Sequence, residues 1–148
     1  MSNPPPNGKV RVISLWQPWA SLMACGAKHL ETRGWDTKVR GRVYIHASQT
    51  KAGIADLRYA SVSTIEAMEK ALALAMGQWM TELPFGKIIS RGDLTETHPG
   101  PKALLAWPDQ EPFGDFAQGR FAHHYNDLTK IEPIPFRGSQ GFFFAKLP

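Results

Sequence analysis

Residues 14–48, SLWQPWASLMACGAKHLETRGWDTKVRGRVYIHAS, crowd charged and polar side chains among large apolar ones. Proline in the first turn of a helix has a preset φ and needs no N–H, so Gln17-Pro18-Trp19 predicts a helix start with Gln17 at the cap. Gly26 predicts the end of this short helix, because glycine readily adopts the left-handed conformation common at helix C-termini. A plain core does not need this mixture, and the stretch is therefore predicted to carry the function.

Residues 29–37 lack helical periodicity and are predicted to form a strand that runs into a turn. Side chains alternate along a strand, so Glu31, Arg33 and Trp35 would share one face. On an open surface they would form a solvated ion pair beside a tryptophan, which adds little stability. In a cleft, Lys28, Glu31 and Arg33 would form a cation–anion–cation cluster. Burying such a cluster is costly, which favours a functional site.

Residues 42–48 alternate again and predict a second strand. Its apolar side chains would face the core: Val43, Ile45 and Ala47. Its other face would meet either water or the cleft that holds Glu31, and it carries Tyr44, His46 and Ser48.

The order of these motifs resembles the ASCH domain, the activating signal cointegrator homology domain. The matching motifs are Gln-Pro-Trp-Ala-Ser-Leu from Gln17, Trp-x-Thr-x-x-Arg-Gly from Trp35 and Ile-His-Ala-Ser from Ile45. The central signature of the family reads here as Gly26, Lys28, Glu31 and Arg33. Further matches lie at residues 113–116, 119–120 and 133–141, so the resemblance covers nearly the whole chain.

The resemblance implies an α+β fold, a small β-barrel related to the PUA domain with helices packed across it. It also implies a hydrolase acting on a nucleoside or RNA, because stand-alone bacterial members remove an acyl group from the exocyclic amine of cytidine. Ribonuclease activity is associated with the family as well. No cofactor is implied, and the expected partner is a nucleoside or single-stranded RNA.

Amide hydrolysis needs a base, a positive group for the oxyanion and an acid for the leaving amine. The resemblance places Lys28 and Glu31 at the catalytic positions. The short deacylating relatives carry a threonine where this chain has Glu31, so the hypothesis here is that Glu31 activates water while Lys28 stabilises the oxyanion. The residues expected to bind substrate or nucleic acid are Trp16, Gln17, Arg33, Trp35, Arg40, Tyr44, His46, Ser48 and Gln140.

Two other classes of function stay open. In a non-catalytic RNA-binding or DNA-binding module, Trp16 and Trp35 would stack on bases, Trp19 would be buried, and basic side chains would contact phosphates, namely Lys38, Arg40, Arg42 and Lys51. In an interaction domain the cleft would be vestigial.

The composition limits which functions and which domain organisation are compatible with the chain. The chain of 148 residues has a net charge of +4, which is compatible with a polyanionic partner. Residues 1–9 are predicted to be a disordered tail and residues 10–148 a single domain. Cys25 is the one cysteine, so no internal disulfide can form; it is expected to be a buried structural thiol in a cytoplasmic protein. No apolar run reaches membrane-spanning length, and the histidines lack the spacing of a zinc site.

The remaining elements are predicted from periodicity and turn residues. A strand is expected at residues 10–15, and an amphipathic helix at residues 63–80 with a capping box formed by Ser63 and Glu66. Strands are expected at residues 87–97 and 119–131, with a proline-rich surface loop at 99–112. Trp107 in this loop would be either a base-stacking platform or a plug over the core, and the plug is favoured. Phe142, Phe143 and Phe144 would form a buried strand that closes the fold on its own start.

Overall fold

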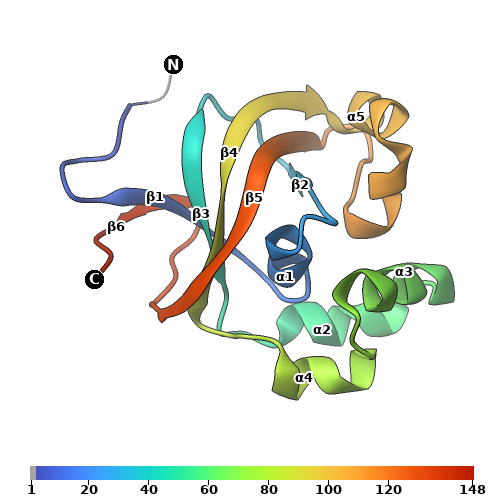
Figure 1. Ribbon diagram of the computed structural model, residues 1–148. Helices are drawn as coiled ribbons and strands as arrows, with labels where there is room; N and C mark the ends of the chain where they lie inside the picture. Colours follow the sequence, from blue (N-terminus) through green and yellow to red (C-terminus); the bar gives the residue numbers. More distant parts are fainter. Residues whose placement is uncertain (1–2) are drawn as a thin grey trace.

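The computed structural model describes residues 3–148 (Figure 1). Its strands are β1 (Val10–Leu15), β2 (Leu30–Arg33), β3 (Gly41–Ala47), β4 (Lys87–Pro99), β5 (Phe121–Pro135) and β6 (Phe142–Ala145). Its α-helices are α1 (Trp19–Ala24), α2 (Ala52–Asp56), α3 (Val62–Leu72), α4 (Trp79–Glu82) and α5 (Gly100–Ala106). Three 3₁₀ turns join them: η1 (Leu57–Tyr59), η2 (Met76–Gln78) and η3 (Pro108–Phe113).

The six strands form one curled sheet in the order β2-β5-β4-β3-β1-β6. Strand β1 pairs parallel with β3, whereas the other neighbours are antiparallel. Helix α1 lies between this sheet and the layer formed by α2, α3 and α4 (Figure 1). The predicted α+β architecture is confirmed as a half-barrel with helices packed across it. The closing strand is also confirmed, because β6 pairs with β1.

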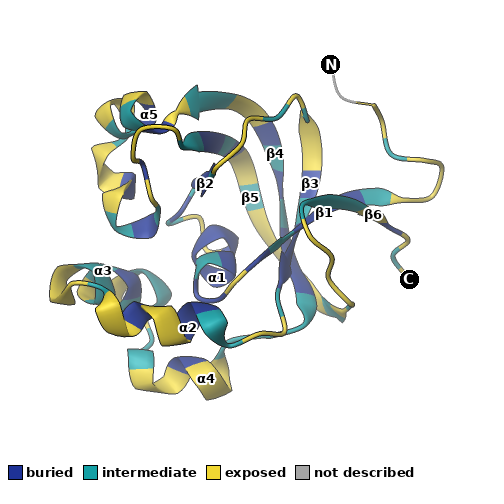
Figure 2. Ribbon diagram, turned by 180° about the vertical axis from the view of Figure 1, so that it is seen from behind, coloured by how far each residue is buried: buried dark blue, intermediate teal, exposed yellow. Residues whose placement is uncertain are grey.

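Helix α1 is the centre of the core, and Figure 2 shows it as largely buried. Its small residues Ala20 and Ala24 pack with Met23 against the sheet residues Ile13 and Ile45. Leu22 faces the other way, into a second cluster that includes Met68 and Trp79 of the helical layer. One short helix therefore joins the apolar cluster of the sheet to that of the helical layer.

The single helix predicted for residues 63–80 is wrong in its length and its cap. Ser61 caps α3, since its Oγ accepts a hydrogen bond from the Thr64 N–H at 3.1 Å. The helix ends at Leu72 because Ala73 adopts a left-handed conformation with φ of 54°. The Leu74 N–H then reaches back to the Glu69 carbonyl, which completes a terminating motif despite the continuing apolar periodicity.

The surface loop predicted for residues 99–112 is also wrong, because this segment forms α5 and η3. Pro101 and Pro108 lie in the first turns of α5 and η3, where no N–H is needed, whereas Pro112 lies inside η3. Phe113 at the end of η3 is buried. Trp107 packs beside the cluster of Leu30 and Ala103, in agreement with the predicted plug.

Burial was predicted incorrectly at two other places. Cys25 is exposed because it follows the last turn of α1, where its thiol donates to the Leu22 carbonyl at 3.3 Å. Phe144 is 42% exposed because β6 is an edge strand with a partner on one side only.

The segment before β1 contains a turn in which the Lys9 N–H donates to the Pro6 carbonyl. Residues 3–9 lie outside any helix or strand, and residues 1–2 of the predicted tail fall outside the described part of the chain. Within residues 3–148, no helix is long and apolar enough to cross a membrane.

Candidate functional site

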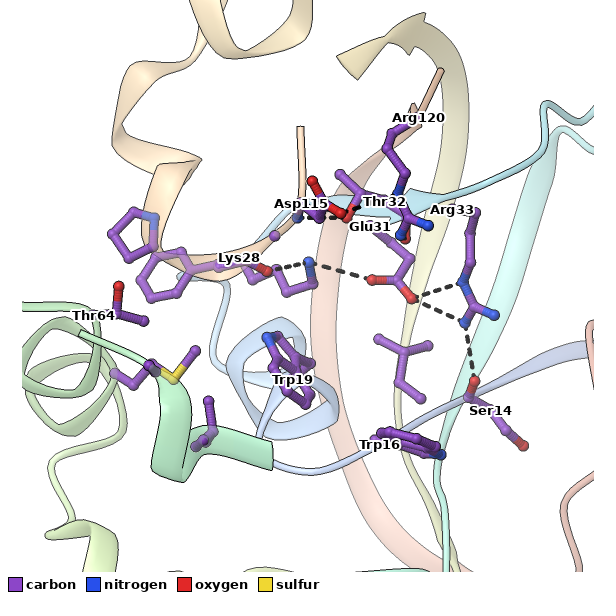
Figure 3. Close-up of a pocket in the computed structure, with 17 residues that line it drawn as sticks. Ser14, Trp16, Trp19, Lys28, Glu31, Thr32, Arg33, Thr64, Asp115 and Arg120 are labelled. Carbon is purple, nitrogen blue, oxygen red and sulfur yellow. Dashed lines mark hydrogen bonds and ion pairs between the residues drawn. The ribbon is translucent and has the colours of Figure 1, made fainter. Parts of the chain in front are cut away.

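A cavity of about 520 Å³ opens between the sheet and the helical layer, over the signature residues of the 14–48 stretch. Its wall contains the end of β1, the segment from Trp16 to Trp19, β2, and the loop that follows η3 (Figure 3). Residues from α3 close the far side. The polar side chains that line it are Ser14, Lys28, Glu31, Thr32, Arg33, Thr64, Asp115 and Arg120.

Lys28 is held at the base of this cavity with 1% of its surface exposed. Its ammonium donates to the carbonyls of Leu30 and Phe113 at 2.7 Å each, and lies 3.3 Å from Glu31 Oε1. These three acceptors match the three N–H groups of a protonated lysine. The ammonium therefore has no N–H left for a ligand unless one of these contacts breaks.

Glu31 lies between Lys28 and Arg33, as predicted for a cleft. Arg33 Nε and Nη2 both approach Glu31 Oε2 at 2.9 Å, and Nη2 also donates to the Ser14 carbonyl at 3.1 Å (Figure 3). The residues alternate along β2, which brings the two charged side chains to one face. The cation–anion–cation cluster is thus a fixed unit of the cavity wall.

The charges of this cluster set its protonation. Burial acts to raise the pKa of Glu31, but the coulombic attraction of Lys28 and Arg33 outweighs it, so the pKa lies below its ordinary value. Burial lowers the pKa of Lys28, and the Glu31 carboxylate opposes that shift. At neutral pH Glu31 is therefore an ionised carboxylate and a weak base.

A second cavity, of about 790 Å³, adjoins the first and shares Ser14, Trp16 and Arg33 with it. Its further polar or aromatic wall residues are Trp35, His46, Ser48, Gln49, Arg137, Ser139 and Gln140. The two cavities meet at the three shared residues, of which Trp16 is exposed. Together they form one cleft.

His46 joins the floor of the second cavity to β1. Its Nδ1 lies 2.9 Å from Ser14 Oγ, and its Nε2 lies 2.7 Å from the Phe136 carbonyl oxygen. Burial lowers the pKa of His46, with the Phe136 carbonyl opposing the shift. The ring is accordingly neutral at physiological pH.

Most of the residues predicted to serve a site lie in this cleft. Lys28, Glu31, Arg33 and Trp16 line the first cavity, whereas Trp35, His46, Ser48 and Gln140 line the second.

Three predicted residues lie outside both cavities. Gln17 is buried and lies one residue before Pro18, the N-cap of α1; its Oε1 accepts from the Ser21 N–H at 3.0 Å. Tyr44 packs beside Val12 in an apolar cluster on the other side of the sheet, and Arg40 donates to backbone carbonyls in an exposed turn.

Several wall residues were missed by sequence reasoning. Trp19 was expected to be buried but is only partly buried and lines the first cavity, because the ring lies at the edge of the apolar clusters. Asp115 and Arg120 lie 3.8 Å apart on the opposite wall, and Arg120 Nη2 donates to the Thr32 carbonyl at 3.1 Å. The sequence signal for Asp115 and Arg120 is the pair of motifs at 113–116 and 119–120 that match the family, to which sequence reasoning assigned no role.

Among the described residues, no group of three or more histidine, cysteine or carboxylate side chains is placed to hold a metal ion. The adjacent pair His123 and His124 diverges along β5: His123 contacts Trp35, and His124 contacts Glu96.

Comparison with known proteins identifies the family and the fold. The ASCH domain matches residues 13–113. Activating signal cointegrator 1 of Homo sapiens is 32% identical over 124 residues, and its Mus musculus counterpart is 30% identical over 106 residues. These alignments include 84% and 72% of this chain but only 17% and 16% of those proteins.

The fold comparison reaches further along the chain. The crystal structure of an ASCH protein from Zymomonas mobilis superposes with a TM-score of 0.57 and 15% identity, covering 94% of this chain and 89% of that one. A single-residue variant of the same protein gives a TM-score of 0.54 at 16% identity, covering 95% and 90%. These structures share the PUA-like half-barrel, and the sequence match supplies the family: this chain belongs to the ASCH domain family.

Proposed function

We propose that the cleft binds a nucleoside, either free or as one unit of a single-stranded RNA, with its base in the first cavity. The observation that carries this proposal is an aromatic wall facing a fixed charged array across a volume of about 520 Å³. Small-molecule pockets are commonly about 300–1,000 Å³ and combine an apolar wall with a few preset polar groups. The rings of Trp16 and Trp19 form that wall (Figure 3).

Glu31 supplies the recognition of the base. Arg33 occupies Oε2 with two donors, and Lys28 occupies one side of Oε1. A carboxylate oxygen accepts two hydrogen bonds, so Oε1 keeps one acceptor site. The exocyclic amine of cytosine or adenine is a donor that fits such a site, as in carboxylate contacts to cytosine N4.

The low pKa of Glu31 counts against its predicted role as the base that activates water. Lys28 likewise has each of its N–H groups engaged. The geometry therefore favours base recognition for Glu31 and a structural role for Lys28, which holds the carboxylate in place.

A second candidate function is removal of an acyl group from the exocyclic amine of cytidine. It is favoured by the continuity of the cleft, because an amine held near Glu31 would carry its acyl group toward the second cavity through the shared boundary at Trp16 and Arg33. Ribonuclease activity is the further alternative, and the same assay detects it.

Calorimetric titration with cytidine, N4-acetylcytidine, a single-stranded RNA hexamer and its duplex tests the proposal. Replacing Trp16 by Ala should weaken binding by about 1–3 kcal/mol, or roughly 5-fold to 150-fold, through loss of base stacking. Trp107→Ala is the matched control, because this ring lies outside both cavities of the cleft. Product analysis of the same mixtures detects released cytidine or cleaved RNA.

For the hexamer, the affinity should fall with salt at a slope of roughly −0.7 per phosphate contact. Absence of binding to every ligand, or equal losses in the Trp16 and Trp107 variants, would refute the proposal.

A further inference from the structure

The side chains of Ser14 and His46 form a hydrogen-bonded pair at the junction of the two cavities. Their α-carbons are register partners in the parallel pairing of β1 with β3, so the contact is set by the sheet itself. Ser14 Oγ lies 2.9 Å from His46 Nδ1. This distance is within the range expected between a nucleophile and its base.

The hydrogen-bond partners determine the tautomer of His46. A carbonyl oxygen only accepts, so the 2.7 Å contact with the Phe136 carbonyl requires the proton on Nε2. Nδ1 is then unprotonated and accepts from the Ser14 hydroxyl. This is the arrangement that a general base needs, with a third group fixing the ring.

The cleft reaches the pair through Ser14, which is partly exposed, whereas His46 is 1% exposed. Ser14 lines both cavities and His46 lines the second. Gly138 lies above them, and a Cβ there would come within 2.6 Å of both Ser14 Oγ and His46 Cε1. A larger residue at this position would therefore press on the pair.

Arg33 supplies positive charge at the same junction. Its Nη2 donates to the Ser14 carbonyl at 3.1 Å, and the hydroxyl of Ser14 points away from the Glu31 cluster (Figure 3). Arg33 also lines both cavities. Because the hydroxyl points away from the guanidinium, Arg33 would act on the reacting carbonyl through its charge and not through a hydrogen bond.

We propose that Ser14 is an acyl-accepting nucleophile and His46 its general base, acting on an ester or amide whose carrier occupies the first cavity. Ser14 Oγ bonds to the acyl carbon as its proton moves to His46 Nδ1. The bond from the acyl carbon to the leaving nitrogen or oxygen then breaks, and His46 returns the proton to the leaving group. In the second half, water attacks the acyl carbon, its proton passes through His46 to Ser14 Oγ, and a carboxylic acid is released.

The proposal rests on the proposed function only for the carrier of the acyl group. Its test is therefore a reaction that needs no carrier, labelling with a fluorophosphonate, followed by peptide mass spectrometry. Ser14 should carry the adduct, and the cavity serines Ser48 and Ser139 should not.

Variants and the pH profile of labelling test the roles of Ser14 and His46. Ser14→Ala should abolish labelling, whereas Ser63→Ala, which changes an exposed serine outside the cleft, should not alter it. His46→Gln should slow labelling by about 100-fold or more. In the wild-type protein, labelling should rise with pH and level off below the ordinary His pKa of about 6.5, since burial lowers the pKa of His46.

Absence of an adduct on Ser14 at pH 8, undiminished labelling of Ser14→Ala, or a rate with no inflection below about pH 6.5 would each overturn the proposal. Nucleoside binding measured on the same samples separates the two hypotheses. Labelling without nucleoside binding would leave the Ser14 reaction standing and remove the proposed ligand. Nucleoside binding without labelling would leave the proposed ligand standing and remove the Ser14 reaction.

Discussion

Replacing Lys28 by Met tests whether the ion cluster is a closed structural unit. The substitution preserves most of the side-chain volume but removes the ammonium, so Glu31 loses one of its two cations and the carbonyls of Leu30 and Phe113 lose a donor. Removing one member of a buried ion pair commonly costs about 3–5 kcal/mol. For a chain of this size that loss corresponds to a fall in Tm of roughly 6–20 °C.

A double-mutant cycle isolates the interaction between Lys28 and Glu31 from the contacts that each makes with other residues. Urea unfolding of Lys28→Met, Glu31→Gln and the double variant gives the coupling free energy directly. The double variant should recover part of the stability lost in Lys28→Met, because it no longer buries an undercompensated carboxylate. Strictly additive losses would contradict this reasoning.

The pH dependence of the unfolding free energy tests the same ion cluster independently. The folded-state pKa of Glu31 is lowered, so its contribution to stability is present above the unfolded value of about 4.3 and is lost as the pH falls through the folded value. In Lys28→Met only Arg33 opposes burial, and the pKa of Glu31 should rise. The difference in unfolding free energy between wild type and variant should therefore narrow below about pH 4. If Lys28→Met lost less than about 1 kcal/mol of unfolding free energy at pH 7, this reasoning would be refuted. A loss of equal size at pH 3 and pH 7 would refute it as well.

Three other substitutions test the packing. The Tyr125 hydroxyl is buried without a hydrogen-bond partner among the described residues, so Tyr125→Phe should raise the unfolding free energy by about 0.5–1.5 kcal/mol; a loss would mean that the hydroxyl is satisfied in solution. In urea unfolding, Ser61→Ala should cost about 1 kcal/mol as the cap of α3 and Ser63→Ala much less, and the reverse order would restore the cap predicted from sequence. A Cβ on Gly53 would lie 2.8 Å from Trp16 Cβ, so Gly53→Ala should cost about 1–3 kcal/mol in thermal unfolding and shift the Trp16 side-chain resonances; an unchanged spectrum would contradict this close packing.

The parts of the site that sequence reasoning predicted well are local. Lys28, Glu31 and Arg33 lie within six positions of one another, and strand alternation alone brings the last two to one face. The hydrophobic patterns of β1 and β3 likewise predicted strands, because each has a core-facing set of apolar side chains.

The parts that sequence reasoning missed depend on long-range contacts. Phe113 contributes a carbonyl to Lys28 across 85 positions, and no pattern in either segment indicates that contact. Gln17 has the residue type of a ligand contact, yet the Pro84 carbonyl 67 positions away holds it inside the protein. Helical periodicity continued past Leu72 although the left-handed Ala73 had already ended the helix.

The pairing of the first strand with the last has a consequence for synthesis. Val10 is a register partner of Ala145, so this edge of β1 stays unpaired until β6 has left the ribosome. Domains generally fold as units during translation, and exposed strand edges in incomplete chains invite association with other molecules. The segment that bears Ser14 and leads into Trp16 is thus translated well before β6, the strand that pairs with the first part of β1.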